Sequence, residues 1–388
     1  MSSLVIHSGR VVSPSGVIEG GYVLAEGSRI VEVGAGQAPA AGRILDARGG
    51  WVMPGLIDLH CHGGGGRSFQ EAEAEATQHV LTTHLRAGAT SLVAAIAACG
   101  RDERHACLAA LRAAPGDGVQ PELLGAYLEG PYFSEKERGA QPQELIRPPD
   151  PADYLPTLAE FGGFIKVWAL APELPGALDF IRRLRAQGIV AALGHSDASD
   201  DAVEAAVSAG ATLVTHVYCA QSTFHRVGAE KKLGLAEMAL LLDELTVEVI
   251  ADGKHLPPNL LRLVLKNKPP SRVCLITDAM PAAGMPPGEY QFLGDTVWVT
   301  HEVAYRADRQ RYAGSVLTMA KAVANVRRQA GMDMAALAEM AALTPARLAG
   351  VADRKGTLEP GKDADIVVLD EALHVKAVVV RGQVSPAL

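Results

Sequence analysis

The chain has 388 residues, enough for one large domain and one small domain. Its 48% hydrophobic and 21% charged residues are typical of a soluble globular protein, and the net charge of -8 argues against nucleic acid as a partner. Residues 1–9 hold no cationic stretch followed by an apolar core, and no apolar run reaches about 18 residues. We therefore expect neither a signal peptide nor a membrane-spanning segment.

The five cysteines are scattered and odd in number, and they include no Cys-x-x-Cys pair. This usage argues against a disulfide framework and against a thiolate zinc site, and it fits the reduced cytoplasm. We expect a cytoplasmic protein in which Cys99, Cys107 and Cys274 fill apolar space.

The first 54 residues alternate short β-type runs with Gly and Pro, which predicts a small antiparallel β unit. The C-terminal end has the same character. We expect the two ends to meet in one small β-sandwich domain, formed by residues 1–54 plus 355–388. The predicted strands are 4–6, 10–12, 22–24, 29–33, 44–46, 365–369 and 375–380.

Residues 55–354 alternate unbroken apolar runs with helical patterns, which predicts a parallel sheet covered by helices. Together with the strand before His60 they give eight β/α units, close to the size of a (β/α)8 TIM-like barrel. A doubly wound open sheet is the alternative, weakened because no Gly-x-Gly-x-x-Gly follows a first strand. The apolar runs are 89–96, 123–128, 164–170, 189–193, 211–215, 246–251 and 273–277. The helical patterns are 70–86, 102–112, 176–186, 200–209 and 259–266.

The apolar run that begins at Pro54 ends in two histidines one residue apart, His60 and His62. Alternate side chains of a strand point to one face, so this pair can bind one metal ion together. The same alternation puts Asp58 on that face and turns Cys61 away. A surface histidine pair at a strand end is the simpler alternative.

Further polar residues follow the later apolar runs, at the point where each predicted strand ends. Each of them alone has a simpler explanation as a polar core residue, a loop charge or a helix cap. The carboxyl ends of barrel strands meet at one mouth, however, so the shared placement predicts a single centre. Lys166 lies near the start of its strand and therefore at the opposite end. The strand-end residues are His60 and His62 (first), Glu129 (third), His195 (fifth), His216 (sixth) and Asp278 (eighth), with His255 at the rim.

Imidazole and carboxylate ligands without thiolate suit zinc, iron, manganese or cobalt. A divalent ion lowers the pKa of bound water towards about 7, which supplies hydroxide at neutral pH. The Asp278 carboxylate can take the water proton and later pass it to a leaving group. The residues therefore predict a metal-dependent hydrolase.

The same motifs resemble the amidohydrolase superfamily and, more narrowly, the N-acetylglucosamine-6-phosphate deacetylase family. Leu-Glu-Gly-Pro at 128–131 is the discriminating match, because many superfamily members instead use a modified lysine on the fourth strand. The matches are collinear over nearly the whole chain. The others are Pro-Gly-Leu-Ile-Asp-Leu-His-Cys-His-Gly at 54–63, Ala-Pro-Glu at 171–173, Gly-His-Ser at 194–196, Thr-His at 215–216, Ala-Asp-Gly-Lys-His at 251–255, Thr-Asp-Ala at 277–279, Gly-Ser-Val-Leu-Thr-Met at 314–319 and Gly-Thr-Leu-Glu-Pro-Gly-Lys-Asp-Ala-Asp at 356–365.

The resemblance implies a role for each matching residue. Asp278 would be the general acid and base, and His255 would polarise or orient the acetamide carbonyl. The reaction would be hydrolysis of the N-acetyl group of N-acetylglucosamine 6-phosphate to glucosamine 6-phosphate and acetate. One or two divalent ions are implied, because some family members lack the His-x-His pair that this chain keeps. Glu129, His195 and His216 would hold the main metal, and His60 and His62 would hold a second, with Glu129 bridging.

One departure concerns the grip on sugar and phosphate. The family has Asn-Ala-Met after Thr-His and an aromatic or aliphatic pair, whereas this chain has Cys219-Ala220-Gln221. Backbone N–H donors do not depend on side-chain identity, so binding can survive the loss of the carboxamide. The candidate substrate-binding residues are Cys219, Ala220, His225, Arg226, His255 and Ser315. In the family the arginine comes from the partner subunit, which implies a homodimer, and a solvated loop pair is the alternative for His225 and Arg226.

Two other hypotheses remain open at this point. The first is an amidohydrolase for N-acetylgalactosamine 6-phosphate, an unphosphorylated acetylated sugar, a cyclic amide or a purine. The second is a catalytically inactive homologue that acts as an interaction protein. Retention of all five candidate metal ligands and of Asp278 argues against the inactive homologue.

Overall fold

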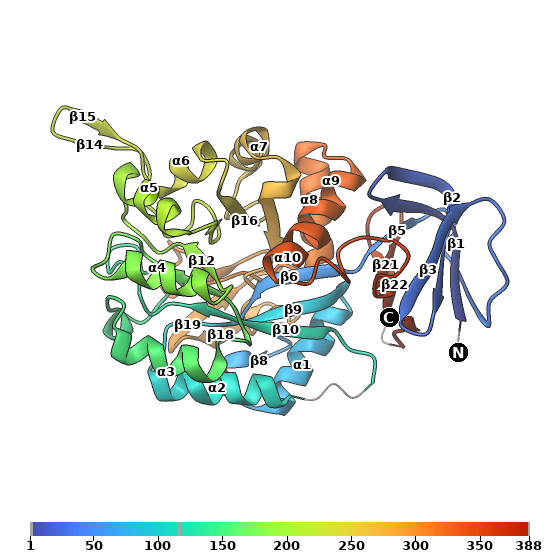
Figure 1. Cartoon of the computed structure of the whole chain (residues 1–388), viewed down its shortest axis with the longest axis horizontal. Helices are drawn as coiled ribbons and strands as arrows, with labels where there is room; N and C mark the ends of the chain where they lie inside the picture. The colour runs from blue at the N-terminus through green and yellow to red at the C-terminus, as the bar shows by residue number, and fades with distance from the viewer. Residues whose placement is uncertain (1–2, 115–117, 387–388) are drawn as a thin grey trace.

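The computed structural model describes residues 3–114 and 118–386. Figure 1 shows a large α/β body with a smaller β sheet at one end, where both chain termini lie. The body contains eight strands in the order β17-β16-β13-β12-β11-β10-β9-β6, and all neighbours in this order are parallel. These strands are β6 (Leu56–Cys61), β9 (Ala89–Ile96), β10 (Glu122–Glu129), β11 (Ile165–Leu170), β12 (Val190–Leu193), β13 (Leu213–Val214), β16 (Thr246–Ile250) and β17 (Val273–Ile276).

The two end strands of this sheet close on each other just beyond their carboxyl ends. The Asp278 backbone N–H donates to the His60 carbonyl oxygen at 2.9 Å, and Cys61 and Ala279 form a parallel bridge. The predicted TIM-like barrel is therefore confirmed, and the open doubly wound sheet is wrong.

Helices follow most of the barrel strands and cover the outside of the sheet (Figure 1). The expected helices are present with boundaries shifted by a few residues. The sequence analysis did not predict α3, α6 or the helices after residue 318. In these segments the apolar positions are interrupted by proline or by many alanines. The helices are α1 (Ala74–Leu85), α2 (Arg101–Ala113), α3 (Pro151–Phe161), α4 (Ala177–Ala186), α5 (Asp200–Ala209), α6 (Leu235–Leu241), α7 (Pro258–Asn267), α8 (Met319–Ala330), α9 (Met334–Ala338) and α10 (Thr344–Leu348).

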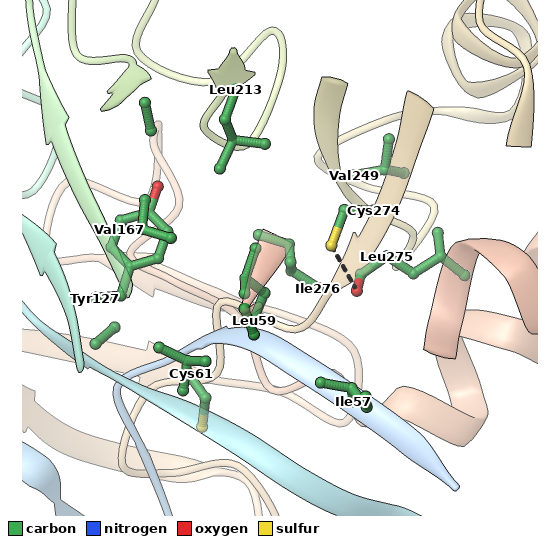
Figure 2. Packing of buried hydrophobic residues seen from close by; sticks show 14 of the residues in the cluster. Ile57, Leu59, Cys61, Tyr127, Val167, Leu213, Val249, Cys274, Leu275 and Ile276 are labelled. Carbon is green, nitrogen blue, oxygen red and sulfur yellow. Dashed lines mark hydrogen bonds between the residues drawn. The ribbon is translucent and has the colours of Figure 1, made fainter. Parts of the chain in front are cut away.

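The barrel strands are buried on both faces, which explains their unbroken apolar sequence. Figure 2 shows Ile57, Leu59 and Cys61 along β6, in the same buried cluster as Ile276 of β17 and Val249 of β16. These side chains belong to one core that extends to the covering helices. The close packing fixes where each strand ends, and it thereby positions the residues at the barrel mouth.

The small sheet is built from both ends of the chain, in the order β23-β22-β21-β5-β1-β2-β3, with β4 pairing β1. Strands β5 and β21 join the two ends, with Val52 opposite Val368 in an antiparallel register. The predicted meeting of the termini is confirmed. The limits 1–54 plus 355–388 and 55–354 stay a prediction. The strands are β1 (Ser3–Ser13), β2 (Gly16–Glu26), β3 (Arg29–Ala35), β4 (Arg43–Asp46), β5 (Trp51–Pro54), β21 (Ile366–Leu369), β22 (Val375–Val380) and β23 (Gln383–Val384).

A network of ion pairs connects the segment before β21 to the start of β10, at the end of the barrel opposite the mouth. Arg354 contacts Glu122 at 2.5 Å and Asp363 at 2.7 Å. The buried Lys355 ammonium contacts Glu122 at 3.0 Å and also contacts Asp365. The network therefore fixes the start of the last chain segment against the barrel.

Three smaller β units were not expected from the sequence. Strands β7 (Gly63–Gly64) and β8 (Arg67–Ser68) form a short antiparallel pair after β6. Strands β18 (Gly288–Phe292), β19 (Asp295–Val299) and β20 (Ala304–Arg306) form an antiparallel sheet between β17 and α8. The hairpin of β14 (His225–Val227) and β15 (Glu230–Lys232) projects from the body beyond α5 (Figure 1). Among the described residues, no helix is long and apolar enough to span a bilayer.

Candidate metal centre and active site

The strand-end residues predicted from the sequence lie together at the barrel mouth and form two groups. His60, His62 and Asp278 form one group, and Glu129, His195 and His216 form the other. Within each group the possible ligand atoms lie within 4.8 Å of one another, and all six residues are buried. The predicted convergence is therefore present, with each residue at the end of the expected strand.

Glu129 lies between the two groups. Its Oε1 accepts hydrogen bonds from His195 Nε2 and His216 Nε2, both at 3.0 Å. Its Oε2 lies 3.4 Å from His62 Nε2, and Asp278 Oδ1 lies 3.3 Å from the same nitrogen. His60 Nε2 and His62 Nε2 are 3.3 Å apart and therefore point to the same position. Four imidazole nitrogens and two carboxylates fit one or two divalent cations.

The electrostatics of the centre also fit a cation. Burial raises the pKa of Glu129, but hydrogen bonds from His195, His216 and His62 outweigh burial and hold the pKa well below its usual range. Burial opposes protonation of His62, yet its hydrogen bonds to Asp278 and Glu129 raise its pKa to about 10. His216 behaves similarly, with Glu129 raising its pKa to about 9 against burial. Without metal, protons therefore supply the positive charge that a metal ion would supply.

The backbone at three of these residues is strained. His195 has φ 47°, His216 φ 23° and Asp278 φ 49°, in the left-handed region that non-glycine residues seldom adopt. Each such residue costs about 1–3 kcal/mol and persists only where its surroundings enforce it. Here the strained residues each lie two residues beyond the ends of β12, β13 and β17, so the cost is concentrated where the chain turns side chains into the mouth.

A buried carboxylate that the sequence analysis did not single out orients the histidines. Glu248 lies in the middle of β16 and is fully buried. Its Oε2 accepts from His60 Nδ1 at 3.1 Å, from Thr215 Oγ1 at 3.2 Å and from the His216 backbone N–H at 3.2 Å. The first contact places the proton of His60 on Nδ1, which leaves Nε2 free to bind a metal. The sequence signal that could have found it is a single acid inside the otherwise apolar run 246–251.

Gln141 performs a similar task for Glu129 and was also missed. Its Nε2 donates to Glu129 Oε2 at 2.6 Å, while its Oε1 accepts from the Ala98 backbone N–H at 2.9 Å. The second contact fixes the orientation of the carboxamide, so the donor faces Glu129. No local sequence pattern marks this loop residue.

The prediction that Asp58 shares the face of His60 and His62 is wrong. β6 shifts register against β9 between Asp58 and Cys61, which breaks the simple alternation. The Asp58 carboxylate accepts from the Thr277 hydroxyl at 2.5 Å and from the Thr277 backbone N–H at 3.1 Å. Asp58 therefore holds the end of β17. Cys61 points away from the histidine pair as expected, against the buried His84.

A cavity of about 390 Å³ opens above the centre. Of the substrate-binding candidates, Cys219, Ala220 and His255 line it. His255 is held by Asp252, whose Oδ2 lies 2.6 Å from Nδ1, and its ring packs against Tyr312 with centroids 4.8 Å apart. The remaining lining residues are His62, Glu129, Lys136, Glu137, Gly139, Ala140, Gln141, His195, His216, Tyr218, Asp278, Phe292, Leu293, Gln310, Arg311, Tyr312 and Gly314.

Three substrate-binding candidates are not brought to this cavity. His225 and Arg226 lie on the projecting hairpin β14–β15, outside the residues that line the cavity. Ser315 is fully buried, and its hydroxyl donates to the Thr277 carbonyl at 2.5 Å. Ser315 therefore supports the strand end that carries Asp278 and does not present its hydroxyl to a ligand.

The fold and the centre define an amidohydrolase. The amidohydrolase family model matches residues 51–385, which include the barrel and the C-terminal strands. The match agrees with the geometry of the mouth, where the six strand-end residues form two groups that could hold a metal ion.

Comparison with individual proteins narrows the class. The chain is 34% identical to N-acetylglucosamine-6-phosphate deacetylase of Bacillus subtilis, over 99% of this chain and 97% of the relative. It is 35% identical to N-acetylgalactosamine-6-phosphate deacetylase of Escherichia coli O157:H7, over 86% and 87%. A mutant N-acetyl-D-glucosamine-6-phosphate deacetylase of Mycobacterium smegmatis, solved in complex with N-acetyl-D-glucosamine-6-phosphate, matches with a TM-score of 0.90, 33% identity and 99% coverage of both chains. The chain therefore belongs to the N-acetylglucosamine-6-phosphate deacetylase family of amidohydrolases.

Proposed function

We propose that this protein hydrolyses the N-acetyl group of N-acetylglucosamine 6-phosphate, releasing acetate and glucosamine 6-phosphate. The observation that carries the proposal is the pair of ligand groups, with Asp278 among them, at the base of a cavity of about 390 Å³. A cavity of this size suits a small-molecule substrate. The Mycobacterium smegmatis protein of the same fold was solved with this sugar phosphate.

The centre suits one or two divalent ions, with zinc, iron, manganese and cobalt as candidates. We assign the main site to Glu129, His195 and His216, and a second site to His60 and His62, with Glu129 shared. A divalent ion bound there would act as a Lewis acid. It would lower the pKa of water towards about 7, which makes the water a better nucleophile at neutral pH.

Asp278 is the proposed general acid and base. Burial raises its pKa, but the hydrogen bond from His62 and the charges of His60, His62 and His216 lower it below the ordinary value. The carboxylate is therefore ionised at neutral pH and can accept a proton from the attacking water. The water oxygen bonds to the acetamide carbonyl carbon, and as the C–N bond breaks, the same proton passes to the amine nitrogen. The acid that leaves holds the water oxygen and its second proton, which it loses to solvent as acetate.

His255 and the loop after β13 are proposed to orient the acetamide and the sugar. His255 is held in place by Asp252 and Tyr312 at the edge of the cavity. Cys219 and Ala220 line the same cavity and carry no side-chain carboxamide. The Cys219 backbone N–H already donates to the His216 carbonyl oxygen at 2.9 Å, so we assign the backbone donor to Ala220.

A homodimer and a cytoplasmic location are part of the proposal. The hairpin β14–β15, with Arg226 on it, projects from the body, which would allow it to reach a neighbouring copy (Figure 1). The cysteines at 61, 99, 107, 219 and 274 are all free thiols, which fits a reducing compartment.

The test is acetate release by metal-loaded protein from N-acetylglucosamine 6-phosphate, its galacto epimer and unphosphorylated N-acetylglucosamine. The epimer is included because the Escherichia coli relative carries that name. We expect the highest kcat/KM for N-acetylglucosamine 6-phosphate. A higher kcat/KM for the epimer or the plain sugar would change the assigned substrate but keep the deacetylase activity. No acetate release from any of the three would refute the proposal.

A further inference from the structure

A side chain of helix α8 contacts the chain segment that leads to His255. Asn325 Nδ2 donates to the Ala251 carbonyl oxygen at 2.8 Å, and Asn325 Oδ1 accepts from an Arg328 guanidinium nitrogen at 2.6 Å. A guanidinium group only donates and a carbonyl oxygen only accepts, so the two partners settle which end of the carboxamide faces Ala251. Asn325 therefore presents its N–H donor to the residue that directly follows β16.

The contact at Ala251 reaches the His255 ring through one further residue, Asp252. The Ala251 carbonyl belongs to the rigid peptide bond that leads into Asp252, so a hydrogen bond to this oxygen fixes the plane of that bond. Asp252 Oδ1 accepts from the His255 backbone N–H at 2.8 Å, and Asp252 Oδ2 lies 2.6 Å from His255 Nδ1. The direction of the Ala251 carbonyl therefore bears on where the His255 ring stands.

A second side chain of α8 lies against the same turn. Gly253 has φ 77°, and a Cβ at this position would lie 2.8 Å from Gln329 Nε2. The positive φ and the close contact together favour glycine there. Asn325 and Gln329 are four residues apart and so share one face of the helix. This face therefore packs against the turn from Ala251 to His255.

The start of the same stretch of chain holds the strand end that carries Asp278. The Ser315 backbone N–H donates to the Asp278 carbonyl oxygen at 2.7 Å, and the Met280 backbone N–H donates to the Ser315 carbonyl oxygen at 2.9 Å. Ser315 lies shortly before α8 begins. One continuous segment, from Ser315 to Gln329, thus contacts both the Asp278 strand end and the turn that carries His255.

We propose that Asn325 is a positioning residue for the deacetylation. Acting through the turn that follows β16, it holds His255 at the distance from Asp278 that the reaction needs. This inference rests on the proposed deacetylase function, in which His255 orients the acetamide carbonyl. Misplacing such a group raises the barrier of the reaction more than it weakens binding of the sugar, so the effect belongs in kcat.

The test compares Asn325→Ala and Asn325→Asp with wild-type protein. Both variants lose the donor to Ala251, and aspartate keeps the size of the side chain and an acceptor for Arg328. We expect each variant to lower kcat for N-acetylglucosamine 6-phosphate about tenfold and to change KM less than about twofold. Asn267→Ala is the matched control, because Asn267 Nδ2 also donates to a backbone carbonyl, that of Leu263 in its own helix α7, at 2.7 Å.

A double-mutant cycle separates positioning from a general loss of stability. In a His255→Ala background, Asn325→Ala should lower kcat by less than about a further twofold, because its effect acts through His255. A further tenfold loss in that background would overturn the inference while leaving the deacetylase function intact. So would a kcat that is unchanged in both single variants of Asn325.

Hydrogen–deuterium exchange tests the inference without activity. The backbone N–H groups of Lys254 and His255 both donate to Asp252 Oδ1 at 2.8 Å, so they should exchange faster in Asn325→Ala than in wild type. Residues 277–280 should exchange as in wild type. Faster exchange in both segments, or in neither, would overturn the inference. If wild-type protein releases no acetate, the deacetylase function fails, and this measurement alone decides whether Asn325 positions His255.

Discussion

Three of the imidazoles at the barrel mouth are oriented through their Nδ1 atoms. His60 Nδ1 contacts Glu248, His195 Nδ1 contacts the Glu137 carbonyl at 3.1 Å, and His255 Nδ1 contacts Asp252. Such contacts select the tautomer and the ring angle, and they raise the basicity of the ligand. His216 differs, since its Nδ1 is buried without a hydrogen-bond partner among the described residues.

Glu248→Gln should weaken metal binding at His60 and His62 by about 10–100-fold, because the uncharged amide no longer supports the Nδ1 proton of His60 as strongly. Metal content after dialysis against graded metal buffers measures the effect, with circular dichroism as the check on folding. Metal content and activity equal to wild type would show that Glu248 only fills space.

Asp278→Asn should lower kcat by about 10²–10⁴-fold, because the amide cannot take a proton from water. Asparagine tolerates the φ of 49° at this position, so the fold should persist. Acetate release measures the loss, and elemental analysis should find metal still bound. Asp102→Asn, at a fully exposed side chain, is the control. Full activity of Asp278→Asn would remove it from the mechanism.

The centre could be predicted from sequence where a residue follows an apolar strand directly. His60, His62, Glu129, His195, His216 and Asp278 met that condition, because strand ends converge in a barrel whatever the loops do. Gln141 lies in a loop whose path depends on packing, so no pattern marked it. Glu248 lies inside a strand, so the search for polar residues at strand ends passed over it. The prediction for Asp58 was wrong because β6 shifts register between Asp58 and Cys61, and an alternating sequence pattern does not show such a shift.

At the scale of elements, the two ends of the barrel strands have different tasks. The carboxyl ends carry the strained, ligand-bearing turns. The amino end of β10 carries Glu122, which joins the ion pairs to Arg354 and Lys355. Burial raises the pKa of Glu122, but the hydrogen bond from Arg354 and the charge of Lys355 outweigh it and lower the pKa to about 2. Strand β10 thus serves chemistry at one end and stability at the other.

The contribution of Glu122 to stability should depend on pH in a defined window. Its folded-state pKa of about 2 is below the ordinary 4.5, so the contribution is complete above about pH 4.5 and is lost as the pH falls towards 2. Glu122→Gln should therefore cost about 2 kcal/mol at pH 7 and much less at pH 3. Urea unfolding of both proteins at the two pH values measures this, and a pH-independent difference would contradict it.

For the whole molecule, metal binding should stabilise the fold, because the proposed ligands come from four different strands of one barrel, β6, β10, β12 and β13. At a free metal concentration of about 100 Kd the gain is about 2.7 kcal/mol, so chelation should lower Tm by a few degrees and metal should restore it. Glu129→Gln is the comparison, since it removes the shared carboxylate and should lose most of the shift. An equal shift in both proteins would place the stabilising ion elsewhere.

The pairing of β5 with β21 sets an order of events during synthesis. β5 ends at Pro54, and its partner strand begins at Ile366, more than 300 residues later. The first strands therefore leave the ribosome long before the edge of β5 can be covered, and an open strand edge is a site for mispairing. The barrel segment lies between β5 and β21 in the sequence, so it is made while the β5 edge is still unpaired. The C-terminal strands can therefore dock only after the rest of the chain has been made, and a chain that stops before Ile366 would leave the β5 edge open.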